Sequence, residues 1–212
     1  MPRRTFERLD VDKRRGILTA AAEEFARHGY YDASLNTIIE QAGLSKGAMY
    51  YYFEDKADLF HTTLMHRFGA LFDQMAQSPA PRTAGEFWKQ IADLSDQKLR
   101  MFRDDPVVAG LSRAILQMVV RGEQDGTLKP LVDASIAATL QLVERGKAVG
   151  AVRIDVPADF IMAVLRSLDD GLGRWMAANM EKMSWDELVR ISRSMMQMLR
   201  AMLSPPSTEK EP

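Results

Sequence analysis

Residues 34–56 read SLNTIIEQAGLSKGAMYYYFEDK, and this stretch decides the fold. Ser34 predicts the start of a helix, because its hydroxyl can accept hydrogen bonds from the amides of the first turn. The apolar residues that follow recur at helical spacing and form one face: Leu35, Ile38, Ile39 and Ala42. Gly43 predicts the end of this helix, since glycine readily takes the left-handed conformation of a helix cap.

A second short helix is expected directly after this turn. Ser45 can cap it, and Met49 and Phe53, which lie four residues apart, predict its inner side. The residues left on its outer side are Lys46, Gly47, Ala48, Tyr50 and Tyr51. A helix, a glycine-containing turn and a short helix with a basic and aromatic outer side are typical of a helix-turn-helix. The second helix of that motif enters the DNA major groove by its N terminus.

The same stretch carries a resemblance to a known family. Residues 42–53 (AGLSKGAMYYYF), followed by Lys56, resemble the DNA-binding signature of the TetR/AcrR family of transcriptional regulators, within a similarity that covers residues 13–64. Residues 146–157 (GKAVGAVRIDVP) are similar to a weaker pattern in the C-terminal domain of that family. The resemblance implies a homodimeric regulator, most often a repressor, that a small-molecule effector releases from a palindromic operator on double-stranded DNA.

The resemblance also implies which residues contact DNA. They are Ser34, Thr37, Lys46, Gly47, Ala48, Tyr50, Tyr51 and Lys56. Lys46 and Gly47 are expected near base edges, whereas Tyr51 and Lys56 are expected at phosphates, which set the register of the protein on the duplex. This chain departs from commoner members by placing Glu54 and Asp55 before Lys56, and their charge is expected to weaken that phosphate contact.

Composition argues against several other functions. The 212-residue chain has no cysteine, which excludes disulfides and thiolate metal sites. Of its three histidines, His61 and His66 lie five residues apart and do not share a helix face. We therefore expect no metal, no cofactor and no enzymatic activity. No run approaches the ~20 apolar residues of a membrane span. No secretory signal opens the chain, so a cytoplasmic protein without membrane contact is expected.

Positive charge is concentrated ahead of the helix-turn-helix. The whole chain has a net charge of −1, but residues 2–15 hold six basic residues against three acidic ones. Phosphate attraction needs only such a local cluster. For Arg3 and Arg4, a DNA-binding role and a merely flexible, solvated N terminus are equal alternatives at this stage.

The rest of the chain is also helical in pattern, which predicts an all-α fold of about nine helices. Residues 1–10 lack periodicity and are expected to be a mobile arm, followed by a DNA-binding domain over residues 11–58. Residues 59–203 are expected to form a helical ligand-binding and dimerisation domain. Residues 204–212 are polar and proline-rich, which predicts a disordered tail.

The last two helices predict a subunit interface. The helix at residues 185–203 has two apolar stripes, and a helix on a protein surface needs only one. The preceding helix, at residues 158–180, is also broadly apolar, and Gly171 and Gly173 permit close backbone approach. The alternative interpretation is a thick core within one chain.

A ligand pocket is predicted from large apolar residues on helices that are expected to face one another. They are Phe72, Met75, Phe87, Trp88, Met101, Phe102, Ile115 and Met118. Methionine side chains adapt readily to the shape of a ligand. Ordinary core packing is the alternative for each of them. Two other functions also stay open: an all-helical enzyme, and an interaction bundle whose helix-turn-helix no longer binds DNA.

Overall fold

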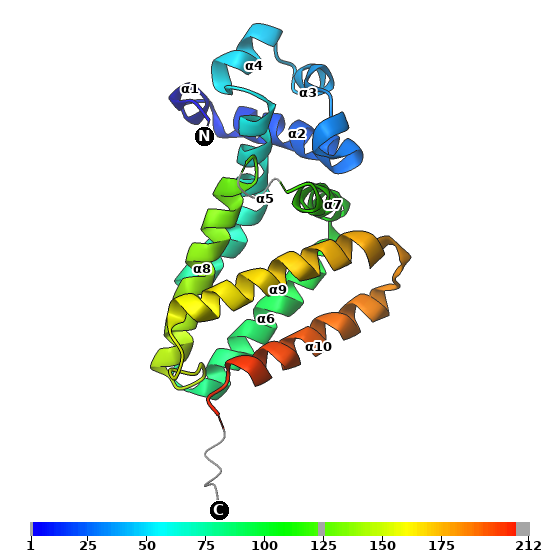
Figure 1. The fold of residues 1–212 in the computed structure, drawn as a ribbon. Helices are drawn as coiled ribbons and strands as arrows, with labels where there is room; N and C mark the ends of the chain where they lie inside the picture. Colours follow the sequence, from blue (N-terminus) through cyan, green and yellow to red (C-terminus); the bar gives the residue numbers. More distant parts are fainter. Residues whose placement is uncertain (1, 123–125, 207–212) are drawn as a thin grey trace, which may run out of the picture. The chain divides into compact units, whose positions relative to one another are not determined.

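The computed structural model describes residues 2–122 and 126–206, and the regular elements of these residues are all helical (Figure 1). The predicted all-α fold is therefore confirmed. The helices group into two compact units, one of residues 1–73 with 101–134 and one of residues 74–100 with 135–212. Within the described residues, no helix is long and apolar enough to cross a membrane.

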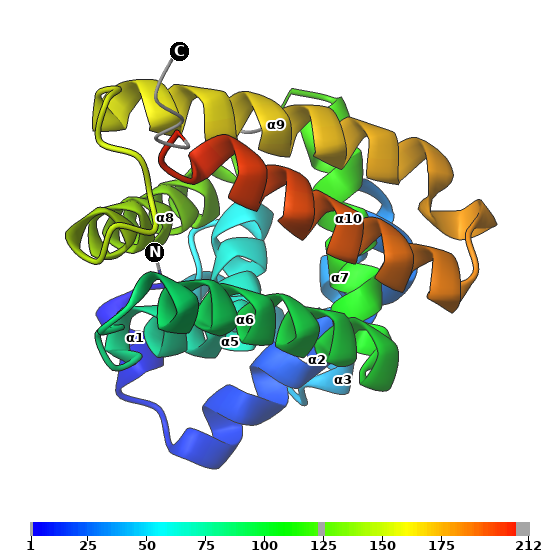
Figure 2. The same cartoon turned by 90° about the horizontal axis from the view of Figure 1, so that it is seen from below.

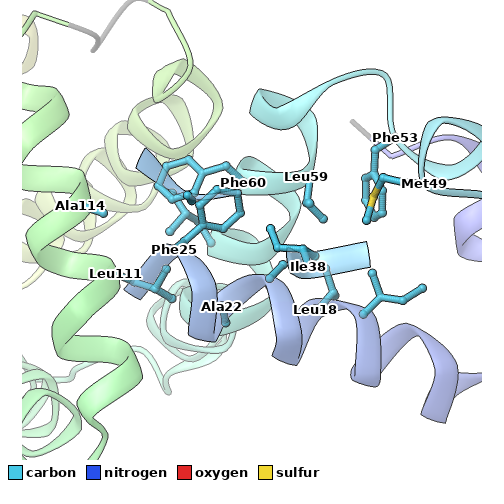
Figure 3. Packing of buried hydrophobic residues seen from close by; sticks show 14 of the residues in the cluster. Leu18, Ala22, Phe25, Ile38, Met49, Phe53, Leu59, Phe60, Leu111 and Ala114 are labelled. Atoms are coloured by element: carbon cyan, nitrogen blue, oxygen red, sulfur yellow. The ribbon is translucent and has the colours of Figure 1, made fainter. Parts of the chain in front are cut away.

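The first unit is built on α2 (Val11–Asp32). Its buried residues Leu18, Ala22 and Phe25 recur at helical spacing and form one apolar side (Figure 3). Against it pack side chains from α3 (Leu35–Gln41), α4 (Lys46–Tyr52), α5 (Lys56–Gln77) and α7 (Pro106–Val120). The rings of Phe25 and Phe60 meet edge to face, with centroids 4.8 Å apart. This single core holds the helix-turn-helix in place.

The crossing of α7 over α2 is unusually close. A Cβ atom on Gly110 of α7 would lie 2.5 Å from the carbonyl oxygen of Ala26 on α2, so only glycine fits there. Near the end of α2, Gly29 has a φ of +71°, which interrupts the helical conformation there. Beyond it, the Arg121 guanidinium lies 4.0 Å from the ring centroid of Tyr31.

The packing of α7 with the N-terminal helices gives a division that differs from the sequence-based one. Because α7 and most of α5 belong to the first compact unit, that unit does not end at residue 58. The sequence-based domains, residues 11–58 and 59–203, describe functions rather than packing. Their assignment to DNA binding and to ligand binding with dimerisation stays a prediction.

The second unit contains most of α6 (Ala84–Asp104) and α8 (Lys129–Ala148), with α9 (Ala158–Asn179) and α10 (Trp185–Leu203). Its buried core consists of Phe87, Trp88, Val143, Ala151, Val152 and Ile161. The helices α9 and α10 run in opposite directions, joined by the short helix η2 (Met180–Lys182) (Figure 1 and Figure 2). A capping box formed by Ser184 and Glu187 starts α10. The predicted tail lies outside the described residues from position 207 onward.

The N-terminal residues differ from the expected mobile arm. Residues 4–7 form α1 (Arg4–Glu7), which packs against α4, and the Phe6 side chain is buried. The expectation is therefore corrected for residues 3–9, and the physical reason is one aromatic residue. Phe6 adds to the first core, because its ring lies against those of Tyr52 and Phe53. Residues 3–9 are too few to form a periodic apolar pattern, so the sequence alone does not show that Phe6 is buried.

Candidate nucleic-acid interface

The helix-turn-helix has the caps that its sequence predicts. The Ser34 hydroxyl accepts a hydrogen bond from the Thr37 amide at 3.3 Å, and the Ser45 hydroxyl accepts one from the Ala48 amide at 3.1 Å. Between the two helices, Gly43 has a φ of +62°, in the left-handed region that favours glycine. These three residues fix where α3 begins, where the chain turns and where α4 begins.

The two sides of α4 differ sharply. Met49 and Tyr52 are buried, whereas Tyr50 and Tyr51 keep 46% and 58% of their surface exposed. Lys46 and Gly47 are also exposed, and Ala48 is half-buried. A Cβ atom on Gly47 would meet no heavy atom within 4 Å, so nothing in the protein itself requires glycine there. The outer side of α4 therefore presents to solvent a lysine, a glycine that has no side chain, and two tyrosines.

A buried carboxylate that the sequence analysis missed supports the start of α3. Glu24 of α2 is only 3% exposed, and its Oε1 accepts a hydrogen bond from the Ser34 amide at 2.8 Å. The Nε2 atom of His28 lies 3.9 Å from the other carboxylate oxygen. A signal was present, because Glu24 lies three residues after Ala21 on the apolar side of α2. Glu24 thus positions Ser34, one of the residues expected to contact DNA.

Lys56 has an internal partner. Its Nζ atom donates to the carbonyl oxygen of Tyr31 at 2.9 Å and lies 5.3 Å from the ring centroid of Tyr30. Burial lowers the pKa of Lys56, although Asp32 and Glu24 oppose this shift by favouring the charged form. The ammonium therefore joins the start of α5 to the end of α2. A contact between Lys56 and a DNA phosphate, as the resemblance implies, stays a prediction.

The acidic residues before Lys56 also have structural partners. The Asp55 Oδ1 atom accepts from the Asp58 amide at 2.8 Å, and the Asp58 Oδ2 atom accepts from the Glu54 amide at 3.1 Å. Asp55 therefore caps the first turn of α5. The first bond satisfies an amide in the first turn of α5, where negative charge is also favoured by the helix dipole, and the second joins that turn to the residue before the cap.

The residues predicted to line a ligand pocket fall in both compact units. Phe87 and Trp88 pack edge to face in the second core, with centroids 5.1 Å apart. Met118 is buried in the first core, with Ile115 partly buried beside it. Met101 and Phe102, near the end of α6, are half-buried, and the side chains of Phe72 and Met75 lie outside the described residues. The pocket itself stays a prediction.

The described residues do not meet the requirements of a metal site. Among the described residues, no group of three or more histidine, aspartate or glutamate side chains is arranged to hold a metal ion. The arrangement that stands out is the short, capped α4 with an outer side made of Lys46, Gly47, Tyr50 and Tyr51. This fold and this exposed helix define a helix-turn-helix DNA-binding protein.

Comparison with known proteins agrees with this class. Residues 17–63 match the family model described as bacterial regulatory proteins, tetR family. The matched segment of this chain is therefore similar to the DNA-binding domain of the TetR family, and the relatives compared below are transcriptional regulators. The match covers the helix-turn-helix, most of α2 before it and the first turns of α5 after it, which is the part that the stronger sequence resemblance identified.

Three relatives illustrate how far the similarity extends. The HTH-type transcriptional activator FasR of Mycolicibacterium smegmatis is 36% identical over 34% of this chain and 33% of its own length. The HTH-type transcriptional repressor AcnR of Corynebacterium diphtheriae is 26% identical over 75% of this chain and 78% of its own. The structure of FadR from Bacillus subtilis in complex with stearoyl-CoA is 18% identical, with a TM-score of 0.67 over 87% of this chain and 96% of FadR. The chain spans about a third or less of the length of several curated relatives that it matches.

Proposed function

We propose that this protein is a sequence-specific transcriptional regulator that acts in the cytoplasm as a repressor, with α4 reading the major groove. The observation that carries the proposal is the outer side of α4. It exposes Lys46, Gly47, Tyr50 and Tyr51, whereas the opposite side of the helix is buried in the protein. Lys46 and Tyr50 are suited to base edges. Tyr51 is suited to a phosphate, because a phenolic hydroxyl can donate to its oxygens.

Regulation by a small molecule is part of this proposal. The solved FadR structure, which shares the fold, holds stearoyl-CoA, an amphipathic molecule. The half-buried Met101 and Phe102, near the end of α6, are among the residues that we propose for the effector site, because methionine adapts readily to the shape of a ligand. Such a ligand must bind the DNA-free conformation more tightly than the DNA-bound one, with a typical coupling of ~1–3 kcal/mol.

Selection of bound sequences from random duplex DNA tests the proposed function. We expect a palindromic site whose half-site centres lie about one helical turn apart, or a multiple of it. The complex with that site is then titrated with fatty acids, acyl-CoA esters and a library of apolar compounds. Release of the DNA by one of them supports the effector proposal. Recovery of no preferred sequence contradicts the reading role of α4, and release by no compound contradicts the effector proposal alone.

The dimer needed for a palindromic site is proposed to form through α9 and α10. On α9, Phe160, Leu168 and Trp175 are exposed, and their spacing places them on one face of the helix. On α10, Met198 is exposed as well. Large apolar residues aligned on one helix face are typical of a protein interface. A second copy of this chain is the natural occupant, since two copies of α4 are required to read two half-sites.

We expect sedimentation at micromolar concentration to give twice the chain mass of 23.9 kDa. An obligate interface of this kind buries on the order of 2,000 Å² or more in total. The double variant Leu168→Glu, Trp175→Glu should therefore sediment as a monomer, because it places charges in an apolar interface. Val120→Glu is the matched control, since Val120 is an exposed apolar residue on α7. A monomeric parent protein, or a double variant that stays dimeric, rules out this interface.

A further inference from the structure

The C-terminal end of α4 is closed by residues from the N terminus of the chain. The Thr5 hydroxyl donates to the carbonyl oxygen of Tyr51 at 2.9 Å, and the Arg3 amide donates to that of Tyr52 at 3.0 Å. The last carbonyls of a helix have no partner within the helix. Because α4 has only seven residues, it depends on such outside partners for a fixed geometry.

Phe6 anchors this contact in the first core. Its side chain is 3% exposed, and its ring centroid lies 4.7 Å from that of Phe53 and 6.2 Å from that of Tyr52. Leu9 also packs against the first core. Local backbone hydrogen bonds close the intervening turn, including one from the Leu9 amide to the Phe6 carbonyl at 3.1 Å. Residues 3–9 are therefore tied to α4 at several points.

The charges of this segment remain on the outside. Arg3, Arg4 and Arg8 are all exposed, and Glu7 is the one acidic residue among residues 3–9. The segment contacts the same helix end that carries the exposed Tyr51. A set of exposed arginines anchored beside the end of α4 complements the negative charge of a DNA backbone, because an arginine that neutralises a phosphate releases counterions.

We propose that residues 3–9, here called the N-terminal strap, hold the end of α4 in place and bind DNA phosphates through Arg3, Arg4 and Arg8. The inference rests on the proposed function, since it needs a duplex lying against α4. Thr5 and Phe6 are positioning residues, which act on DNA through α4. The arginines contact the phosphate backbone directly and add affinity without adding sequence preference.

The triple variant Arg3→Gln, Arg4→Gln, Arg8→Gln tests the phosphate contacts. Binding weakens as salt rises, and each lost phosphate contact reduces the magnitude of the slope of log K against log salt by about 0.9. We therefore expect the slope to become shallower by about 2–3 per subunit. The site preferred by the parent should stay the same. The matched control, Arg82→Gln, Arg100→Gln, Arg113→Gln, removes the same charge from exposed residues outside the strap and should keep the parent slope. Circular dichroism checks that all three proteins fold alike.

The hydroxyl of Thr5 is tested by a pair of variants. Thr5→Val removes the donor to the Tyr51 carbonyl with little change in shape, and we expect operator binding to weaken about three- to tenfold at an unchanged salt slope. Thr5→Ser keeps the donor and should bind as the parent does. This rescue separates the hydrogen bond from a general loss of packing.

The outcomes separate the inference from the function on which it rests. A parent protein that selects no DNA sequence overturns the proposed function and the strap with it. A parent that binds its selected site with the same salt slope as the triple arginine variant overturns the phosphate contacts of the strap alone. Equal operator affinity for Thr5→Val and the parent overturns its positioning role.

Discussion

Replacement of Gly110 by alanine is expected to lower the free energy of unfolding by about 1–3 kcal/mol, the usual cost of forcing extra atoms into a packed core. The added Cβ would lie 2.5 Å from the carbonyl oxygen of Ala26 and 2.6 Å from its Cβ. The carbonyl belongs to the backbone of α2 and cannot move aside as a flexible side chain does. The helices α2 and α7 must separate, which loosens the contacts of Leu111 and Ala114 with the core around α2.

Gly16→Ala is the matched control for this prediction. Gly16 lies on α2 itself, is exposed, and has no heavy atom within 4 Å of an added Cβ. Alanine is favoured over glycine in a helix by roughly 0.8–1 kcal/mol, so this variant should be slightly more stable than the parent. Chemical denaturation of the three proteins measures the difference. If both alanine variants gain stability, α7 does not pack on α2 as closely as the structure indicates.

The sequence predicts those features that depend on residues a few positions apart. Ser34, Gly43 and Ser45 each act on the backbone within their own turn, so capping rules were sufficient to place α3, the turn and α4. The exposed positions of Tyr50 and Tyr51 follow from helical spacing alone. The family resemblance rests on these same residues.

Contacts between distant segments could not be predicted in this way. The Thr5 hydroxyl meets a carbonyl 46 positions along the chain, and the Lys56 ammonium meets one 25 positions back. Gly110 shows no local reason to be glycine, because its reason is a backbone from another helix. Lys56 illustrates the consequence. Its motif position implies a phosphate contact, whereas its contacts in the structure join two helices of the protein.

The predicted ligand-lining residues have a related difficulty. Large apolar residues on facing helices serve core packing and ligand binding equally well, and composition does not separate the two. Met118 is fully buried in the first core with Leu111, while Phe87 and Trp88 belong to the second. The assignment of Met118 to the first core follows from the packing of α7 on α2. That packing depends on Gly110, and no periodic pattern in the sequence indicates it.

Replacement of Gly47 by leucine is expected to abolish specific DNA binding while leaving the fold intact. Gly47 is exposed in the first turn of α4, and an added Cβ meets no heavy atom of the protein within 4 Å. In the proposed complex, a leucine at position 47 would project into the space that the floor of the major groove occupies. Because leucine is a better helix former than glycine, stability should hold or rise by roughly 0.5–1 kcal/mol.

Gel shifts with the selected operator and with unrelated DNA measure this effect. We expect Gly47→Leu to bind the operator no more tightly than unrelated DNA, a loss that is typically about 10³-fold or more. Gly85→Leu is the matched control, because Gly85 is an exposed glycine on α6 whose added Cβ would come no closer than 3.8 Å to any atom. That variant should bind as the parent does. Lys46→Ala should weaken operator binding by about 1–3 kcal/mol and relax the preference at one position of each half-site, since Lys46 is proposed to contact a base edge without setting the depth of the helix. If Gly47→Leu folds normally and keeps the affinity and preference of the parent, then α4 does not enter the groove and another surface reads the DNA.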